Sequence, residues 1–224
     1  DNKIDKHSDD EVPSIAIIPF DNKGADEDSF YAYSISADLI SDISSAGLIR
    51  VPSLKRVEEV ADLSLDEKAA KLDVRYTVEG SLWKMDDIFQ LSVEFYDTKD
   101  KKVVWSDRWQ EKWDNLSTIK GSLSDGFLKV LDATSKVEKK VETTNTEAYE
   151  FYLKAKHKYY KRENTDDTEI VRGLLNKAIE LDDNLIVAKD FLGWTYSEMG
   201  DYDEAMEIYT TALKQSEKLG DKLR

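Results

Sequence analysis

The sequence predicts an α/β fold, a mixed sheet with packed helices, followed by an all-α solenoid of paired helices. Three observations lead to this prediction. Short apolar or alternating segments, separated by turns, fill the first part of the 224-residue chain, a pattern typical of strands mixed with helices. Helical periodicity fills the last part without strand-like interruptions. Within that part, apolar residues recur at a fixed spacing, which indicates stacked helical pairs.

The first predicted strand is Ser14–Phe20 (SIAIIPF), a short apolar segment closed by Pro19. A polar loop, Asp21–Asp28, then leads to a helix that begins near Ser29. This helix carries apolar residues at helical spacing: Ile35, Leu39, Ile40 and Ile43. We expect it to end at Gly47, because glycine readily adopts the left-handed backbone found after a helix.

Two shorter elements follow this helix. The apolar segment Leu48–Val51 predicts a second short strand. A further helix is expected to run through Leu72, since Ser64 and Glu67 have the spacing of a helix-starting capping box.

Three strand-like segments then predict an antiparallel meander. They are Val74–Met85, Ile88–Tyr96 and Lys102–Gln110. In the middle segment apolar and polar side chains alternate, so one face of the strand is expected to be buried and the other polar. Acidic turns, Asp86–Asp87 and Asp97–Asp100, separate the strands. A helix over residues 115–133 is expected to close the domain.

This reading divides the chain into four parts. They are a flexible acidic leader (1–13), the α/β domain (14–133), a polar linker (134–145) and the helical array (146–224). Four helices are expected in the array, at residues 146–162, 167–182, 185–199 and 202–218.

A step of 34 residues maps one helical segment of the array onto another. The pairs are Val171 and Ala205, Leu174 and Ile208, Leu175 and Tyr209, Ala178 and Ala212, and Ile179 and Leu213. This period resembles that of the tetratricopeptide repeat, two antiparallel helices whose apolar faces are buried only when neighbours stack. The resemblance implies about two repeats and a concave surface that binds a protein. Because stable arrays need three or so repeats, we expect this one to be truncated.

The second repeat both follows and departs from the repeat pattern. Its small residues Gly193, Ala205 and Ala212 suit the places where paired helices approach most closely. The Trp that is usual in the motif is replaced by Lys189. Several spaced positions therefore agree with the repeat, although this Trp is absent.

The α/β part also resembles a known family. The resemblance rests on five segments: SIAIIPFDNKG, SFYAYSISADLISDI, LIRVPS, KLDVRYTVEGSL and VVWSDRW. They are similar to the TolB-amino-terminal-like domain of bacterial signalling proteins, and the match covers Ser14–Val130. The resemblance implies a place between an upstream effector and downstream tetratricopeptide repeats, the effector being a nucleotide cyclase, a Ser/Thr kinase or a winged-helix regulator. Ser34 stands where this family commonly has glycine.

Charge and composition limit the partners. The net charge of −15, from 32 basic and 47 acidic residues, argues against nucleic-acid binding. There is no cysteine, so the sequence leaves the redox compartment open. Neither a signal peptide nor a membrane span is recognisable, so we expect no direct membrane contact from this segment. The chain begins at Asp1, and we interpret it as a soluble fragment of a longer protein, compatible with a membrane anchor on either side.

Catalytic signals are few, and we expect no enzyme, cofactor or metal site in this segment. The only histidines are His7 and His157, and no phosphate-binding glycine loop occurs. The alternative that stays open is a small hydrolase with paired carboxylates, such as Asp21 and Glu79. It requires a deep pocket with two facing acids and strongly shifted pKa values.

The candidate partner-binding residues lie in the predicted concave face of the array. On the first helix of the second repeat, Asp190, Trp194 and Ser197 are expected to face the groove, and a step of 34 residues places Lys156 and Tyr160 beside them. Exposed aromatic residues dominate binding hot spots, so these residues could anchor a peptide. The competing interpretation is that Trp194 packs against a neighbouring helix or the α/β domain.

These observations favour a non-catalytic sensory or protein-interaction module of a bacterial signalling protein. The repeats would dock a protein partner or mediate self-association. A third interpretation is an envelope-associated assembly factor, which differs mainly in its compartment. The sequence identifies neither the partner nor the effector.

Overall fold

The computed structural model describes residues 12–47, 49–131, 143 and 145–219. The chain divides into two units, which are described separately. The first is Asp1–Lys112 with Ile119–Glu138, and the second is Trp113–Thr118 with Lys139–Arg224. Most of the predicted leader and linker lie outside the described residues. No helix in the described ranges is both long and apolar enough to cross a bilayer.

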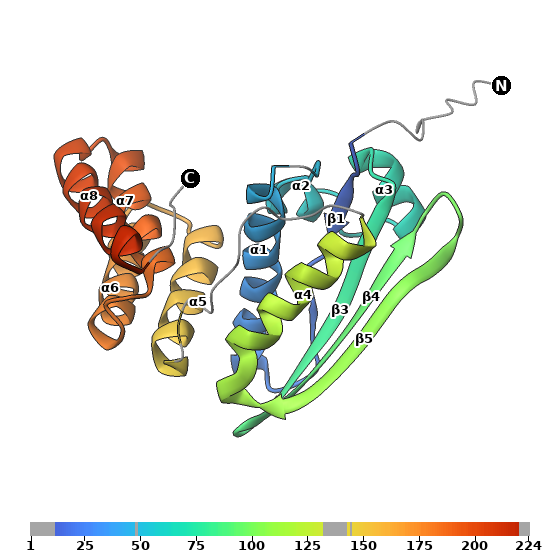
Figure 1. The fold of residues 1–224 in the computed structure, drawn as a ribbon. Coiled ribbons are helices and arrows are strands. Elements are labelled where there is room, and N and C mark those ends of the chain that lie inside the picture. Colours follow the sequence, from blue (N-terminus) through green and yellow to red (C-terminus); the bar gives the residue numbers. More distant parts are fainter. Residues whose placement is uncertain (1–11, 48, 132–142, 144, 220–224) are drawn as a thin grey trace. The chain divides into compact units, whose positions relative to one another are not determined.

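A five-stranded mixed sheet forms the first unit (Figure 1). Its strands are β1 (Ile15–Ile17), β2 (Asp21–Asn22), β3 (Tyr76–Met85), β4 (Ile88–Asp97) and β5 (Lys102–Lys112). β1 and β2 pair with β3 in parallel, whereas β3, β4 and β5 form an antiparallel meander. The predicted α/β class, with a mixed sheet and packed helices, is confirmed.

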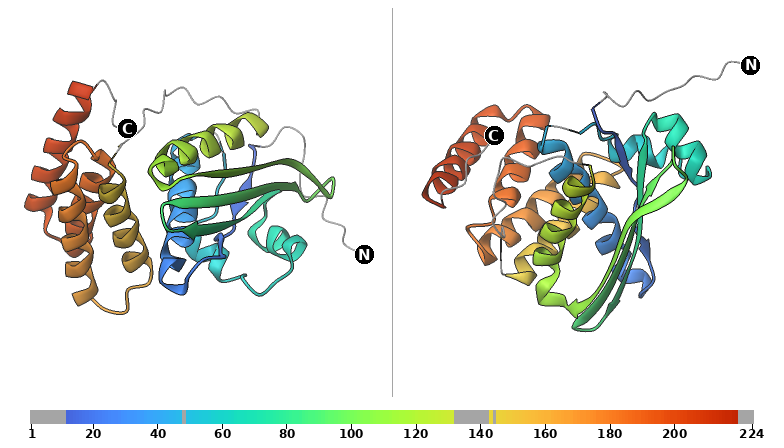
Figure 2. Two further views of the ribbon diagram at one scale, coloured as in Figure 1. Left: turned by 90° about the horizontal axis from the view of Figure 1, so that it is seen from below. Right: turned by 45° about the vertical axis from the view of Figure 1, so that its right-hand side comes forward.

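Helices cover both faces of the sheet near β1 (Figure 2). They are α1 (Ser29–Ser45), α2 (Leu54–Glu58), α3 (Leu65–Leu72) and α4 (Leu116–Val130), and a short 3-10 turn, η1 (Asp26–Asp28), precedes α1. A second 3-10 turn, η2 (Trp113–Asn115), comes before α4 in the chain and is grouped with the second unit. Ala16 of β1 is buried with residues of α2 and α3. On the other face, Phe95 of β4 meets Phe127 of α4 at 5.6 Å between ring centroids.

The alternating pattern of β4 decides which of its faces enters the core. Phe89, Leu91, Val93 and Phe95 are buried, while the residues between them are polar and more exposed. This agrees with the predicted alternation, because successive side chains of a strand point to opposite faces. The capping box of Ser64 and Glu67 also forms as expected, with the Ser64 backbone N–H donating to the Glu67 carboxylate at 2.9 Å.

One predicted strand is wrong. In Leu48–Val51, only Arg50 makes a ladder contact, an isolated parallel bridge to Ser14, and Leu48 lies outside the described residues. A strand needs continuous backbone pairing, which an apolar pattern alone does not provide. The sequence also gave no sign of α2, whose five residues are too few to display helical periodicity.

Two antiparallel helical pairs form the second unit: α5 (Thr146–Tyr160) with α6 (Asp166–Leu181), and α7 (Ile186–Met199) with α8 (Tyr202–Leu219). The four helices agree with the predicted ones to within two residues at each end. Gly200 ends α7 with φ of 88°, a left-handed conformation that glycine adopts without strain. Ala178, Ala205 and Ala212 are buried where the helices pack.

Lys189 makes a buried polar contact within the second helical pair. Its ammonium is buried, and it donates to the carbonyl and the carboxylate of Asp183, each at 2.6 Å, and to Gln215 of α8. A cation thus links the loop before α7 to α8.

Candidate functional site: an aromatic surface on the second unit

The predicted groove residues lie on two helices of the second unit. Asp190, Trp194 and Ser197 follow each other at intervals of four and three residues on α7, so they share one side of this helix. Tyr160 is the last residue of α5. Trp194 and Tyr160 are 40% and 41% exposed, so part of each ring is accessible to solvent.

Tyr159 joins these two exposed rings. Its ring centroid lies 4.7 Å from that of Trp194 and 5.6 Å from that of Tyr160, edge to face in both cases. Phe191 completes the group, stacked at 5.8 Å on Trp194 and 5.4 Å from Tyr159. Such ring pairs add about 0.5–1.5 kcal/mol each beyond burial. The structure therefore holds Trp194 and Tyr160 on a packed base while one side of each remains open.

A charged network fixes Tyr159. Its hydroxyl donates to the carboxylate of Glu198 on α7, at 3.0 Å from both oxygens. Arg162 donates to the same carboxylate at 2.9 and 3.1 Å, and its guanidinium lies 3.9 Å from the Tyr159 ring centroid. Burial and the bond to Glu198 raise the pKa of the Tyr159 hydroxyl far above its usual value. Tyr159 is therefore a neutral hydrogen-bond donor at every physiological pH.

Asp190 differs from its neighbours because it is a half-buried acid for which the described residues supply no hydrogen bond or ion pair. Burial raises its pKa to about 6. It lies close enough to Tyr209 of α8 for its charge to add to the burial that raises the Tyr209 pKa. A carboxylate in such a place would gain from an incoming cation or hydrogen-bond donor.

The remaining two predicted residues contribute less to the open surface. Lys156 is buried, with its ammonium 5.4 Å from the Tyr152 ring centroid, so its role is in packing and not in an open groove. Ser197 is half-buried on α7. The structure thus brings together Tyr160 and Trp194 through Tyr159, and leaves Asp190 further along α7.

Sequence reasoning missed four members of this surface: Tyr159, Arg162, Phe191 and Glu198. Tyr159 and Glu198 are 39 residues apart, and Arg162 and Glu198 are 36 apart. These residues lie on separate segments and are much further apart in sequence than neighbours on one helix, so they meet only because the end of α5 and the residues after it pack against α7. The single available signal was the 34-residue step that relates Tyr160 to Trp194.

The carboxylates of the hydrolase alternative do not face each other. Asp21 is exposed, with its carboxylate 3.0 Å from the Lys23 ammonium. Glu79 is exposed on the sheet, opposite Glu94 of β4. Neither lies in an enclosed pocket, and the described ranges contain no cluster of His, Asp or Glu suited to a metal. Asp21 and Glu79 therefore do not form the pair of facing carboxylates in a deep pocket that the hydrolase alternative requires.

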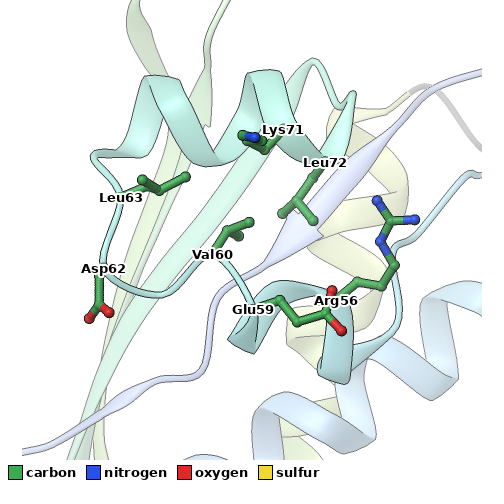
Figure 3. Close-up of a pocket in the computed structure, with 7 residues that line it drawn as sticks. All are labelled: Arg56, Glu59, Val60, Asp62, Leu63, Lys71 and Leu72. Carbon is green, nitrogen blue, oxygen red and sulfur yellow. The ribbon is translucent and has the colours of Figure 1, made fainter.

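An open hollow of about 500 Å³ lies between α2 and α3 of the first unit (Figure 3). Its lining residues are Arg56, Glu59, Val60, Asp62, Leu63, Lys71 and Leu72. The charged members are all exposed, and only Leu72 is buried. Exposed acidic and basic side chains thus surround the buried Leu72, and none of the charged residues that line this hollow is enclosed.

Comparison with known proteins gives one relative by sequence. No protein-family model matches the chain. The chain is 23% identical over 186 residues to "Putative adenylate cyclase 3" of Rhizobium meliloti (strain 1021). The matched segment covers 79% of this chain and 31% of that protein. This chain therefore spans about a third of the relative's length.

Solved structures resemble about half of the chain. TolB from Acinetobacter baumannii matches with a TM-score of 0.41 and 18% identity, over 55% of this chain and 29% of TolB. The PelC dodecamer from Paraburkholderia phytofirmans matches with a TM-score of 0.37 and 19% identity, over 55% of this chain and 89% of PelC. Lipoprotein GNA1162 from Neisseria meningitidis gives 0.40 and 12%, over 51% of this chain and 95% of the lipoprotein.

Proposed function

We propose that this chain is a non-catalytic sensory and protein-interaction module of a bacterial signalling protein. The observation that carries the proposal is the pair of exposed rings, Trp194 and Tyr160, held on Tyr159 and Phe191. Large aromatic side chains on a rigid base are the usual anchors of protein interfaces. Here the helical unit docks a protein, and the α/β unit acts as a responsive spacer.

Two further points support a place in signalling. The α/β segments resemble the TolB-amino-terminal-like domain, which in bacterial signalling proteins precedes tetratricopeptide repeats. The relative from Rhizobium meliloti is named as an adenylate cyclase, and this chain matches 31% of it. On this proposal, the effector lies outside residues 1–224, and a nucleotide cyclase is its first candidate class. This step rests on analogy between proteins and not on a reactive site.

The test uses the natural polypeptide that contains these residues. Cyclic nucleotide formation is measured with residues 14–219 present and deleted, and with Trp194→Ala and Tyr160→Ala. Thr211→Ala, an exposed change on α8, is the matched control. We expect the deletion and both aromatic variants to change the output or its response, while the control behaves as the wild type. An output that is the same with and without residues 14–219 would refute the proposal.

A further inference from the structure

One carboxylate holds two residues of the aromatic surface at once. The Glu198 side chain on α7 accepts hydrogen bonds from the Tyr159 hydroxyl and from both terminal nitrogens of the Arg162 guanidinium, at 2.9–3.1 Å. The guanidinium in turn lies 3.9 Å from the Tyr159 ring centroid. The three side chains therefore form a closed group, in which each member contacts the other two.

The backbone that carries Arg162 is fixed by the start of α6. The Asp167 carboxylate accepts the backbone N–H of Glu163 at 2.8 Å and pairs with the Lys158 ammonium at 2.6 Å. The loop after α5 is thus tied down on both sides of Arg162. From this loop the Arg162 side chain reaches α7, where Glu198 receives it.

A comparison within the chain indicates that the group is not needed to pair two helices. The 34-residue step relates Tyr159 to Gly193 and Arg162 to Tyr196. The α7–α8 pair thus forms with a glycine at the position where α5 has a tyrosine. A large ring bonded to a carboxylate is therefore particular to α5, and its role lies in the surface that it supports.

The ring of Tyr159 depends on this one acceptor for its place. Tyr159 is 8% exposed, and among the described residues its hydroxyl donates to Glu198 alone. The exposed rings of Trp194 and Tyr160 rest on it, at 4.7 and 5.6 Å between centroids. A buried donor without an acceptor is costly, so the position of all three rings is linked to the carboxylate.

The charged part of the group lies where it can open without unfolding the helices. The side chains of Arg162 and Glu198 are 30% and 34% exposed, so their ion pair is open to water on one side. Partly exposed ion pairs are weakened by salt and contribute modestly to stability. The bond between Glu198 and the buried hydroxyl is therefore the part that fixes the rings.

We propose that Glu198 is a latch that keeps Trp194 and Tyr160 together as one surface, through its bond to Tyr159. With the bond made, both exposed rings rest on the Tyr159 ring. With the bond broken, the hydroxyl turns out to water and the two rings lose their common support. This rests on the proposed function, which makes these rings the docking surface, and it specifies what controls that surface. Glu198 is thus a positioning residue, since it acts through Tyr159.

Fluorine NMR of the whole chain, labelled with fluorinated tryptophan, reports on Trp194 directly. The five tryptophans give five signals, and Trp194→Phe identifies the signal of Trp194. We expect Glu198→Ala to shift this signal, while the tryptophans of the sheet, Trp83, Trp105 and Trp109, keep theirs. Glu207→Ala, at an exposed site of α8, is the matched control and should shift none of them.

Two conservative variants separate the latch from a general loss of packing. Glu198→Gln keeps an oxygen that can accept from Tyr159 but carries no charge for Arg162, and it should return the Trp194 signal most of the way to its wild-type position. Tyr159→Phe keeps the ring and removes the hydroxyl. In that background Glu198→Ala should no longer shift the Trp194 signal, because no buried donor is left without an acceptor.

Two results would overturn the inference: a Trp194 signal that Glu198→Ala leaves in place, and an equal shift with and without the Tyr159 hydroxyl. If either was found while Trp194→Ala still altered the output of the natural polypeptide, the latch would fail and the proposed function would stand. If the latch variants behaved as expected but deletion of residues 14–219 left the output unchanged, the proposed function would fail and the latch would remain a property of the fold.

Discussion

Gly193 of α7 lies directly against the ring of Tyr209 on α8. A Cβ atom placed at Gly193 would be 2.8 Å from Cε1 and 3.0 Å from Cζ of that ring. Carbon atoms in contact normally lie about 3.5–4.0 Å apart, so the α7–α8 pair has no room for a side chain here. The small residue that we expected at this position is thus required by the crossing of the two helices.

Gly193→Ala should consequently destabilise the helical unit, although alanine favours helices. We expect the free energy of unfolding to fall by about 1–3 kcal/mol, the usual result of overpacking a core, and Gly193→Trp to separate the pair and expose it to protease. Gly173→Ala on α6 is the control, because a Cβ there meets nothing within 4 Å. It should stabilise by about 0.5–1 kcal/mol. Urea unfolding measures both, and equal effects would show that the α7–α8 packing described here is wrong.

A buried ion pair links α1 to α4 in the first unit. The Lys120 ammonium lies 2.7 Å from the Asp38 carboxylate and 3.3 Å from that of Asp42. Lys120→Met should lower the free energy of unfolding by about 3–5 kcal/mol, because it leaves buried carboxylate charge without its counter-ion. Lys129→Met makes the same change at an exposed site of α4 and should have little effect. In a double-mutant cycle, Asp38→Asn should recover part of the loss, and strictly additive effects would contradict the pairing.

Arg75 and Asp97 tie the start of β3 to the end of β4. Arg75 Nη2 lies 2.8 Å from the Asp97 carboxylate, which also accepts backbone N–H groups of Lys99 and Asp100. Burial alone would raise the Asp97 pKa, but these bonds hold it below its usual value. The stabilisation is therefore present above the unfolded pKa of about 4 and is lost as the pH falls through the lower folded pKa.

Asp97→Asn should accordingly reduce stability at pH 7, by about 2–3 kcal/mol for a partly buried, hydrogen-bonded pair. Between pH 5 and pH 2.5 the variant should lose less further stability than the wild type, since the titrating group is gone. Denaturant unfolding across this range gives the comparison. Asp87→Asn, in the exposed turn between β3 and β4, is the control. Parallel pH profiles for wild type and Asp97→Asn would contradict this account.

The fold could be predicted from the sequence wherever the spacing of apolar residues shows which side chains are buried. The alternation in β4 and the periodicity of the four helices of the second unit both mark which side chains are inside. The prediction of a strand at Leu48–Val51 was wrong because a strand requires backbone pairing with a neighbouring strand. Arg50 forms only an isolated bridge to Ser14. An apolar segment indicates burial, but the choice between strand and loop is made by tertiary contacts.

The candidate surface was predictable to a smaller extent. The 34-residue step relates Trp194 to Tyr160, and both are exposed. The same step placed Lys156 beside them, but that side chain is buried. The Glu198 carboxylate that holds Tyr159 and Arg162 comes from another helix. Repeat spacing thus identifies equivalent positions, whereas exposure depends on which helix covers each copy.

Asp190 gives the second unit a specific pH dependence. Burial raises its pKa from 3.8 to about 6, so the native state holds this proton more tightly than the unfolded chain. The stability contributed by the protonated form is complete below about pH 4 and is lost as the pH rises towards 6. A shift of this size corresponds to roughly 3 kcal/mol for a fully buried group. Because Asp190 is half-exposed and screened by solvent, we expect about 1 kcal/mol.

Asp190→Asn should therefore unfold at a higher temperature than the wild type at pH 7.5, and the difference should disappear at pH 4, where both side chains are neutral. Differential scanning calorimetry at several pH values measures this directly. Asp203→Asn, an exposed acid on α8, is the matched control and should give the same small shift at both pH values. A wild type that is more stable than Asp190→Asn at pH 7.5 would mean that the carboxylate already has a partner.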